Sequence, residues 1–339
     1  MPITFAELTT LRVGGPVGEL IDAPGSEALV GAVRAADAAG RPVLVIGGGS
    51  NIVVSDDGFD GLVVRSTGSG VRFGPDANVT LDAGVQWDAA VLGSLENGLS
   101  GLEALSGIPG SAGGSPIQNI GAYGTVMSDV LAELTVYDRE RTVVETWTPD
   151  RCGFGPHRQS VFKHSERYVV LDVTFALSRS GLSRPVGYVA LADELGVAVG
   201  AQVPAADVRT AVLTLRGRRG MLLDAADHDT WSVGSFFLNP VLRQVPAAAV
   251  DAPQYPDPAG TKLSAAWLIE HSGFGRGYGA EVGRGVVRLS SKHTLAVTNR
   301  GDASAAEVLT FAAHVRDGVE RAFGVRLEPE CDLINCVLP

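Results

Sequence analysis

A run of three glycines between two short apolar segments is the feature that most restricts the possible folds of this chain. Val43–Ile46 and Ile52–Val54 are both predicted to form strands, joined by the tight loop Gly47–Asn51. A Rossmann dinucleotide-binding turn would need a helix directly after the glycines, whereas the β-branched residues here favour a strand. Successive backbone N–H groups, with the Ser50 hydroxyl and the Asn51 amide, can still bind a diphosphate. A simple hairpin turn is the alternative interpretation.

A second glycine-dense segment covers residues 98–124, with the sequence GLSGLEALSGIPGSAGGSPIQNIGAYG. Glycine accepts positive φ freely and lets a ligand approach the backbone closely, so this density predicts a loop wrapped around a ligand. The alternative is a low-complexity linker. It is disfavoured because buriable side chains interrupt the glycines: Leu102, Leu105, Ile108, Ile117, Ile120 and Tyr123.

Periodicity divides the 339 residues into three predicted regions, which together give an α+β fold. Residues 1–69 form a small region with an amphipathic helix that Ser26 caps. Residues 70–206 contain a helix from Trp87 and three later strand-like runs. Residues 207–339 contain a strand-like run over Ser232–Leu238, a helix around Lys262–Glu270 and a final helix over about Ala303–Phe323.

Composition and charge exclude several classes of function. A formal net charge of −11 would repel nucleic acid and anionic lipid, so an anionic ligand must meet local positive charge. No apolar stretch is long enough to span a membrane, and the first ten residues lack a secretory pattern, so we expect a soluble cytoplasmic protein. Neither the six histidines nor Cys152, Cys331 and Cys336 have metal-ligand spacing, which predicts free thiols and no metal.

Six motifs, in order, resemble the UDP-N-acetylenolpyruvoylglucosamine reductase family over nearly the whole chain. They are LRVGGP (11–16), VIGGGSN (45–51), GLEALSGIPG (101–110), PIQNIGAYG (116–124), GSFFLNP (234–240) and LEPE (327–330). The resemblance implies the FAD fold of the vanillyl-alcohol oxidase type, in which two α+β domains bind FAD and a third covers the substrate. Many relatives in the wider fold attach the flavin covalently through a histidine in the first glycine loop. This loop has no histidine, so noncovalent FAD is expected.

The same resemblance implies an oxidoreductase of peptidoglycan synthesis. Electrons from NADPH would reduce the enolpyruvyl vinyl ether of UDP-N-acetylglucosamine enolpyruvate to UDP-N-acetylmuramate. The sequence shows no separate Rossmann site, so NADPH and the UDP-sugar would use the same flavin face, and NADP⁺ would leave before the substrate binds. We expect a monomer with these two partners and no nucleic-acid or membrane partner.

The resemblance assigns FAD contacts to residues in four of the motifs and in the stretch between the third and fourth motifs. These residues are Arg12, Ile46, Gly47, Gly48, Gly49, Ser50, Asn51, Gly110, Ser111, Gly113, Gly114, Gln118, Asn119, Ile120, Gly121, Ala122, Tyr123 and Gly124.

Three residues match the family's catalytic positions. Saturating an enol ether beside a carboxylate requires a hydride, a proton for the carbon that bears the carboxylate, and stabilisation of the enolate. By resemblance, Arg158 in HRQSVFK would bind the substrate carboxylate. Glu330 would stabilise the enolate in a protonated or proton-sharing state, and Ser235 would donate the proton. Without the motifs, the three would be a surface arginine, a capping glutamate and a turn serine. His157 and Cys331 depart from the commoner family residues.

Five further residues match substrate-binding positions: Tyr188, Arg219, Asn239, Lys262 and His293. Arg219 replaces the usual lysine, and both basic residues also fit a solvated surface. Two other functions stay open from the residues alone. One is an FAD oxidase of this fold that uses oxygen, which leaves Arg158, Ser235 and Glu330 without a joint explanation. The other is a flavin-storing or nucleotide-binding module, for which the third region would be unnecessary.

Overall fold

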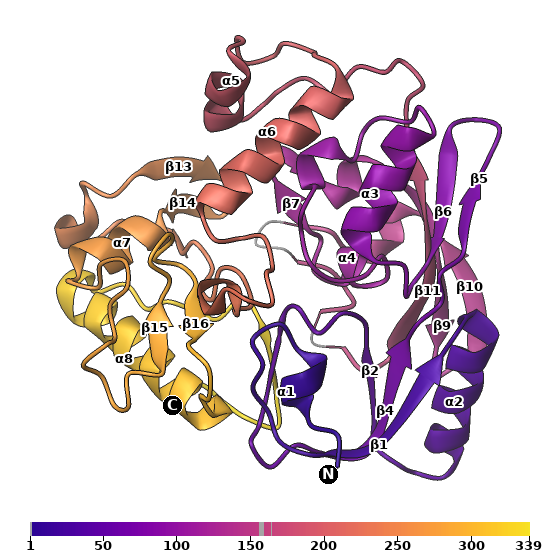
Figure 1. Ribbon diagram of the computed structural model, residues 1–339, viewed down its shortest axis with the longest axis horizontal. Helices are drawn as coiled ribbons and strands as arrows, with labels where there is room; N and C mark the ends of the chain where they lie inside the picture. The colour runs from indigo at the N-terminus through magenta and orange to yellow at the C-terminus, as the bar shows by residue number, and fades with distance from the viewer. Residues whose placement is uncertain (1, 156–158, 164) are drawn as a thin grey trace. The chain divides into compact units, whose positions relative to one another are not determined.

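The computed structural model describes residues 2–155, 159–163 and 165–339 (Figure 1). The chain forms two compact units. Unit 1 contains residues 1–17, 49–59 and 219–339, and unit 2 contains residues 18–48 and 60–218. The boundary between them crosses the first glycine loop between Gly48 and Gly49. This division groups N-terminal segments with the C-terminal region; the three contiguous domains 1–69, 70–206 and 207–339 stay a prediction.

The smaller sheet of unit 2 contains the strand that leads into the first glycine loop. Its order is β1 (Val17–Ala23), β4 (Phe59–Ser66), β2 (Val43–Ile46), and β2 runs parallel to β4. Helix α2 (Ser26–Ala38) packs Leu29 and Val33 into the core that this sheet shares (Figure 1). The predicted cap is wrong by one residue, since Gly25 is the N-cap and the Ser26 hydroxyl donates to the Leu171 carbonyl (3.4 Å).

The larger sheet of unit 2 has five antiparallel strands. Their order is β10 (Val143–Trp147), β9 (Leu131–Asp138), β11 (Tyr168–Ala176), β6 (Asn78–Asp82) and β5 (Val71–Phe73). Helix α3 (Trp87–Glu96) and the second glycine-dense segment share its core. Leu102 and Leu105 are almost completely buried, so this segment is a packed part of the fold, not a linker. Helices α5 (Val189–Leu195) and α6 (Ala205–Arg218) form a separate apolar cluster.

Unit 1 joins the second strand of the first glycine loop to the end of the chain. Strand β3 (Ile52–Val54) pairs in parallel with β17 (Asp332–Ile334). The other strands form a pair, β15 (Val287–Leu289) with β16 (Val297–Asn299), and the three-stranded sheet β12 (Val241–Leu242), β14 (Gly260–Leu263), β13 (Gln254–Asp257). Helix α8 (Ala305–Phe323) buries its apolar face in the same core as α7 (Ala265–His271).

One predicted element of unit 1 is wrong, and another begins later than predicted. Residues 232–238 form an irregular segment with bends and one isolated bridge, Phe237–Pro329, and not a strand; Gly234 leaves the β region with φ of +77°. Lys262 lies in strand β14, not in a helix. The helix begins only at Ala265, since the Ser264 hydroxyl accepts a hydrogen bond from Trp267 N (3.3 Å) and caps it.

Three structural findings concern the membrane, metal and cysteine predictions made from the composition. Among the residues that the structure describes, no helix has both the length and the apolar character to cross a membrane. Within those same residues, no cluster of histidine, cysteine or acidic side chains could hold a metal ion. Cys152, Cys331 and Cys336 are free thiols, as predicted.

Candidate functional site

The two predicted cofactor loops touch each other within unit 2. A Cβ atom on Gly47 would lie 2.1 Å from Ser111 Oγ, and one on Gly48 would lie 2.9 Å from Gly110 Cα. The Gly48 contact is with backbone, which cannot turn aside, so glycine is required there. At Gly47 the Ser111 hydroxyl would have to rotate away, and Ser111 Cβ would still lie 3.0 Å from the added atom. The loops therefore expose backbone to each other at close range, as a backbone cradle for an anionic group needs.

The second loop is anchored at its start to the strand and helix that precede it. Ala112 N donates to Val85 O (2.8 Å), and Gly113 N donates to Ala83 O (2.9 Å). Gly114 begins the short helix α4 (Gly114–Ile117). These bonds fix residues 110–114 independently of any ligand.

Strained backbone and an unsatisfied polar atom mark the end of the same loop. Asn119 has φ of +37° and Tyr123 has φ of +49°, a conformation that non-glycine residues rarely adopt. Asn119 Oδ1 is buried and has no hydrogen-bond partner among the described residues. Such strain and such orphaned acceptors cluster at ligand sites. The loop therefore fits a bound group that offers hydrogen-bond donors, as the ribityl chain and ring edge of a flavin do.

Tyr188 packs against the C-terminal end of this glycine-dense segment. Its ring packs edge-on against Tyr123, with centroids 5.6 Å apart, and the side chain is 40% exposed. Buried Glu103 holds the loop that leads to Tyr188, because its carboxylate accepts hydrogen bonds from Gly101 N (2.5 Å) and Arg184 N (3.3 Å). The structure thus brings a predicted substrate contact next to a predicted cofactor contact.

Arg158 and its neighbour His157 lie outside the described residues. The next part of the motif is described: the Ser160 hydroxyl donates to the Ile117 carbonyl (2.7 Å) at the end of α4. The HRQSVFK segment is therefore tied to the second glycine loop two residues after Arg158.

In unit 1, the second half of the first glycine loop lies against the LEPE motif. Gly49 has φ of +58°, and a Cβ there would lie 2.0 Å from Leu8 O. The Asn51 side-chain amide donates to Glu330 O (3.4 Å), and Asp332 N donates to Asn51 O (3.0 Å). The parallel pairing of β3 with β17 continues this contact. A predicted cofactor residue thus adjoins a predicted catalytic residue.

Backbone hydrogen bonds bring the segments of Ser235, His293 and Glu330 together. Phe236 N donates to Leu295 O (2.8 Å), and Phe236 O accepts from Glu330 N (2.8 Å). The extended segment that follows Ser235 is therefore flanked by the segments that carry His293 and Glu330. Phe236 and Phe237 are 0% and 1% exposed, whereas Ser235 and Glu330 are half-buried. The buried phenylalanines anchor a segment whose polar residues can still reach a ligand.

Arg12 lies over an aromatic ring at the other end of this segment. Its guanidinium carbon is 3.9 Å from the Trp231 ring centroid, and its φ of +57° is left-handed. The buried Asn299 amide holds this backbone by donating to Leu11 O and Arg12 O, both at 3.1 Å. A cation held on an indole face is a rigid partner for an anionic ligand.

His293 is neutral at ordinary working pH. Burial is the main cause, and the charges of Arg219 and Arg276 add to it, which together lower the pKa of His293 to about 4. Arg219 therefore lies close enough to His293 to act on it electrostatically. The imidazole can donate or accept a hydrogen bond but adds no charge of its own.

Asn239 and Lys262 are placed by the β12–β14 pair. Lys262 pairs with Val241, and Leu263 N donates to Pro240 O (2.9 Å). Asn239 Oδ1 accepts from Ala265 N (2.9 Å) at the start of α7. The Asn239 carbonyl therefore has a structural role in addition to any ligand contact.

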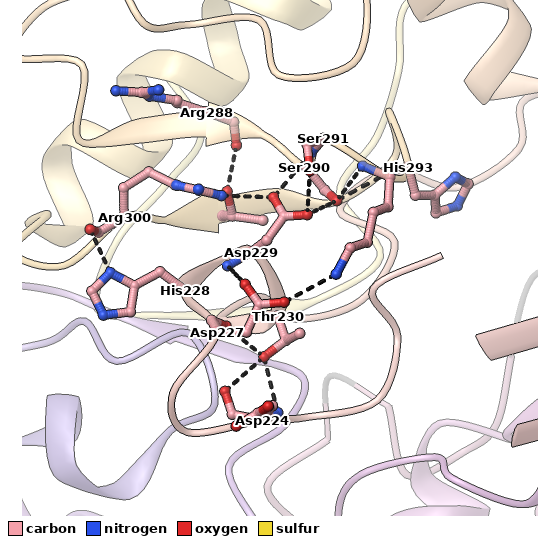
Figure 2. A network of polar contacts seen from close by, with 12 residues as sticks. Asp224, Asp227, His228, Asp229, Thr230, Arg288, Ser290, Ser291, His293 and Arg300 are labelled. Atoms are coloured by element: carbon pink, nitrogen blue, oxygen red, sulfur yellow. Dashed lines mark hydrogen bonds and ion pairs between the residues drawn. The ribbon is translucent and has the colours of Figure 1, made fainter. Parts of the chain in front are cut away.

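A buried polar network around Asp229 was not predicted (Figure 2). Asp229 is 3% exposed and accepts hydrogen bonds from the Ser290, Ser291 and Arg300 side chains. The signal in the sequence was the acidic run DHDT, three residues before the GSFFLNP motif, together with the run SSKH that contains His293. Neither run has a periodicity that identifies its partner.

The comparisons with known proteins agree with these features. Residues 226–334 match the model of the UDP-N-acetylenolpyruvoylglucosamine reductase C-terminal domain, and residues 20–146 match that of the FAD binding domain. A UDP-N-acetylenolpyruvoylglucosamine reductase from Nocardia farcinica is 54% identical, over 97% of this chain and 87% of that protein. One from Saccharopolyspora erythraea is 49% identical, over 98% and 95%. The crystal structure of the Thermus caldophilus enzyme aligns with a TM-score of 0.67 at 25% identity, covering 98% of this chain and 97% of that one.

Proposed function

The chain belongs to the UDP-N-acetylenolpyruvoylglucosamine reductase family, and we propose that it uses NADPH and noncovalently bound FAD to reduce UDP-N-acetylglucosamine enolpyruvate to UDP-N-acetylmuramate. The relatives confirm the family that the six motifs predicted, and the FAD binding domain match confirms the fold class. The chain is therefore a flavoprotein oxidoreductase.

The residues present fit FAD. Gly47, Gly48 and Gly110 form a backbone cradle that a Cβ would fill, and Asn119 Oδ1 is a buried acceptor without a partner among the described residues. We assign the diphosphate to the cradle and the flavin to residues 118–124. When bound, FAD supplies the hydride that the reaction needs.

The observation that carries the catalytic assignment is the hydrogen-bonded position of Phe236. It sets Ser235 beside the segment of Glu330 through the bond from Glu330 N to Phe236 O. The Ser235 hydroxyl holds the proton for the carbon that bears the substrate carboxylate. Glu330, protonated or sharing a proton, would donate a hydrogen bond to the developing enolate, and Arg158 would bind the carboxylate bidentately.

The chain has a net charge of −11, so positively charged side chains must bind the anionic substrate. Arg219 and Lys262 would contact the diphosphate, while neutral His293 and the Asn239 amide would donate hydrogen bonds to the sugar nucleotide. Tyr188, which packs on Tyr123, would close over the ligand. NADPH would use the same site first, and NADP⁺ would then leave.

The proposed setting is the cytoplasm, where the product enters peptidoglycan synthesis and so contributes to cell shape and division. We propose a monomer, because none of the assigned residues requires a second copy of the chain. Sedimentation at micromolar concentration tests this, and a dimer would contradict it.

A two-step spectral experiment tests the function. The purified protein is reduced anaerobically with NADPH while the flavin absorbance is followed, and the enolpyruvyl sugar nucleotide is then added. We expect bleaching by NADPH and recovery of the flavin spectrum only with that substrate. Rapid recovery with oxygen and none with the sugar nucleotide would support the oxidase instead. Absence of a bound flavin would overturn both enzymes.

A further inference from the structure

The turn between β15 and β16 carries His293, and one hydroxyl holds it in shape. Ser290 Oγ accepts hydrogen bonds from Lys292 N (3.0 Å) and His293 N (3.3 Å). The turn is closed further by Ala296 N, which donates to His293 O (3.1 Å), and by Ser290 N, which donates to Ala296 O (2.8 Å). The position of His293 therefore depends on the orientation of the Ser290 hydroxyl.

Asp229 fixes that orientation from outside the turn (Figure 2). The Ser290 hydroxyl has one proton and donates it to Asp229 Oδ2 (3.0 Å), so its lone pairs face the two backbone N–H groups. The Ser291 hydroxyl donates to the same oxygen (2.8 Å), and Ser291 N donates to Oδ1 (2.9 Å). Every contact from the turn to this carboxylate is a donor, which only an ionised acid can satisfy.

The carboxylate is charged in spite of its burial. Burial opposes its ionisation, but the hydrogen bonds from Ser291 and Ser290 and the charge of Arg300 outweigh burial and lower the pKa of Asp229. Arg300, which follows β16, donates to Oδ1 at 2.6 Å and so clamps both ends of the β15–β16 connection to one acid. Buried charge-assisted hydrogen bonds of this kind are strong and geometrically specific.

We propose that Asp229 is a positioning residue of the active site, which sets the His293 turn and, through Leu295, the segment that carries Ser235. Leu295 lies in the same connection and accepts the hydrogen bond from Phe236 N. Asp229 itself lies six residues before Ser235 in the chain and is too buried to contact a ligand. This role rests on the proposed function, in which His293 and Ser235 meet the substrate.

The variant Asp229→Asn tests the geometry with little change in shape. An asparagine NH₂ group cannot face Arg300 and Ser291 N, so it would point to the serines. The Ser290 hydroxyl would then accept a hydrogen bond from this NH₂ group. It would lose the orientation in which it accepts hydrogen bonds from Lys292 N and His293 N. We expect flavin reduction by NADPH to stay within twofold of the parent protein. Reoxidation by the sugar nucleotide should slow by about 10-fold or more, because small misplacements of reacting groups are costly.

A histidine titration by NMR in the FAD-loaded protein provides a readout that needs no substrate. In the parent protein we expect a His293 midpoint near pH 4, because burial and the nearby Arg219 and Arg276 lower its pKa to about 4. Loosening the turn exposes the ring, so Asp229→Asn should raise the midpoint toward the ordinary 6.5. A general loss of stability elsewhere would leave this midpoint where it is.

Asp224→Asn is the matched control. It makes the same chemical change in the same loop, on an exposed carboxylate that accepts a hydrogen bond from Ala226 N (2.8 Å). It should change neither the midpoint nor the rate of reoxidation by more than twofold. If Asp229→Asn does not fold, Ser290→Ala removes the same hydroxyl and should give the same two effects.

The outcomes separate the two proposals. A parent protein that the sugar nucleotide does not reoxidise contradicts the proposed function, whatever the titration shows. An active parent protein with an unshifted His293 midpoint in Asp229→Asn, or with equal effects from Asp224→Asn, overturns the positioning role.

Discussion

The side-chain amide of Asn51 donates a hydrogen bond to the backbone carbonyl of Glu330, at 3.4 Å. One residue belongs to the first glycine loop and the other to the last motif of the chain. Their contact joins the part of the molecule assigned to the cofactor with the part assigned to acid catalysis. Five predictions about the site and the stability of the fold can be measured.

Removing the Ser235 hydroxyl should separate the two half-reactions. Ser235→Ala keeps the backbone ladder through Phe236, so NADPH should reduce the flavin at a near-normal rate. Reoxidation by the sugar nucleotide should slow by ~10²-fold or more, because the proton donor is lost. Stopped-flow absorbance measures both steps. Ser232→Ala, three residues earlier, is the control, and a slow first step with normal reoxidation would contradict the assignment.

Glu330→Gln tests the acid at the enolate. Glutamine keeps the size of the side chain, but its amide N–H is a weaker hydrogen-bond donor than a carboxyl O–H and stabilises the enolate less. Reoxidation should therefore slow by ~10²-fold while flavin content and NADPH reduction persist. Glu328→Gln, in the same motif, should behave as the parent protein. Equal rates in Glu330→Gln and the parent protein would remove Glu330 from the mechanism.

Gly47→Ala should prevent flavin binding through a defined clash. The new Cβ would lie 2.1 Å from Ser111 Oγ and 3.0 Å from Ser111 Cβ, so the Ser111 side chain must turn away or the two loops must move apart. We expect a purified protein with at most about a tenth of the normal flavin content, since the cradle depends on close backbone approach. The ratio of flavin to protein absorbance measures it.

The clash also predicts a rescue. Gly47→Ala combined with Ser111→Gly removes the colliding atom and should regain a large part of the flavin. Gly31→Ala, in α2 where an added Cβ meets nothing within 4 Å, should keep all of it. Normal flavin content in Gly47→Ala would mean that these loops do not hold the diphosphate.

Asp56 stabilises the start of α8. Its carboxylate accepts from Ala305 N (2.8 Å) and Ala306 N (2.9 Å), where the helix has unpaired donors. Asp56→Ala should lower the free energy of unfolding by about 1–2 kcal/mol, as for other lost helix caps. Urea unfolding measures this change. Asp57→Ala, one residue later, should cost much less, and equal effects would argue against capping.

Stability should depend on pH through His293. Its pKa of about 4 in the folded protein lies below the unfolded value of 6.5, so between these values the unfolded chain binds more protons. This contribution is complete above about pH 6.5 and is lost as the pH falls toward 4, by at most about 1.4 kcal/mol per pH unit. His293→Gln should show a shallower dependence than the parent protein in this window. Parallel curves in urea unfolding at several pH values would contradict the buried neutral imidazole.

The sequence by itself determined the local structure around the glycines and the family. β-Branched residues after Asn51 excluded a helix, and the observed strands β2 and β3 have the predicted bounds. Six ordered motifs identified the family because they are recognised from the order of residue types along the chain, without knowledge of the fold. These features depend on residues that are close together in the sequence, so the sequence alone reveals them.

Only the tertiary structure decided which distant segments meet. The residue types of 232–238 predict a strand, but Gly234 has a positive φ. Phe236 N donates to Leu295 O and Phe236 O accepts from Glu330 N, so the segment is irregular and held from two sides. The role of Asp229 was equally hidden. No pattern in the sequence around Asp229 indicates that Ser290, Ser291 and Arg300 donate hydrogen bonds to its carboxylate. Burial and hydrogen bonding between residues far apart in sequence depend on the folded chain, so no local pattern can encode them alone.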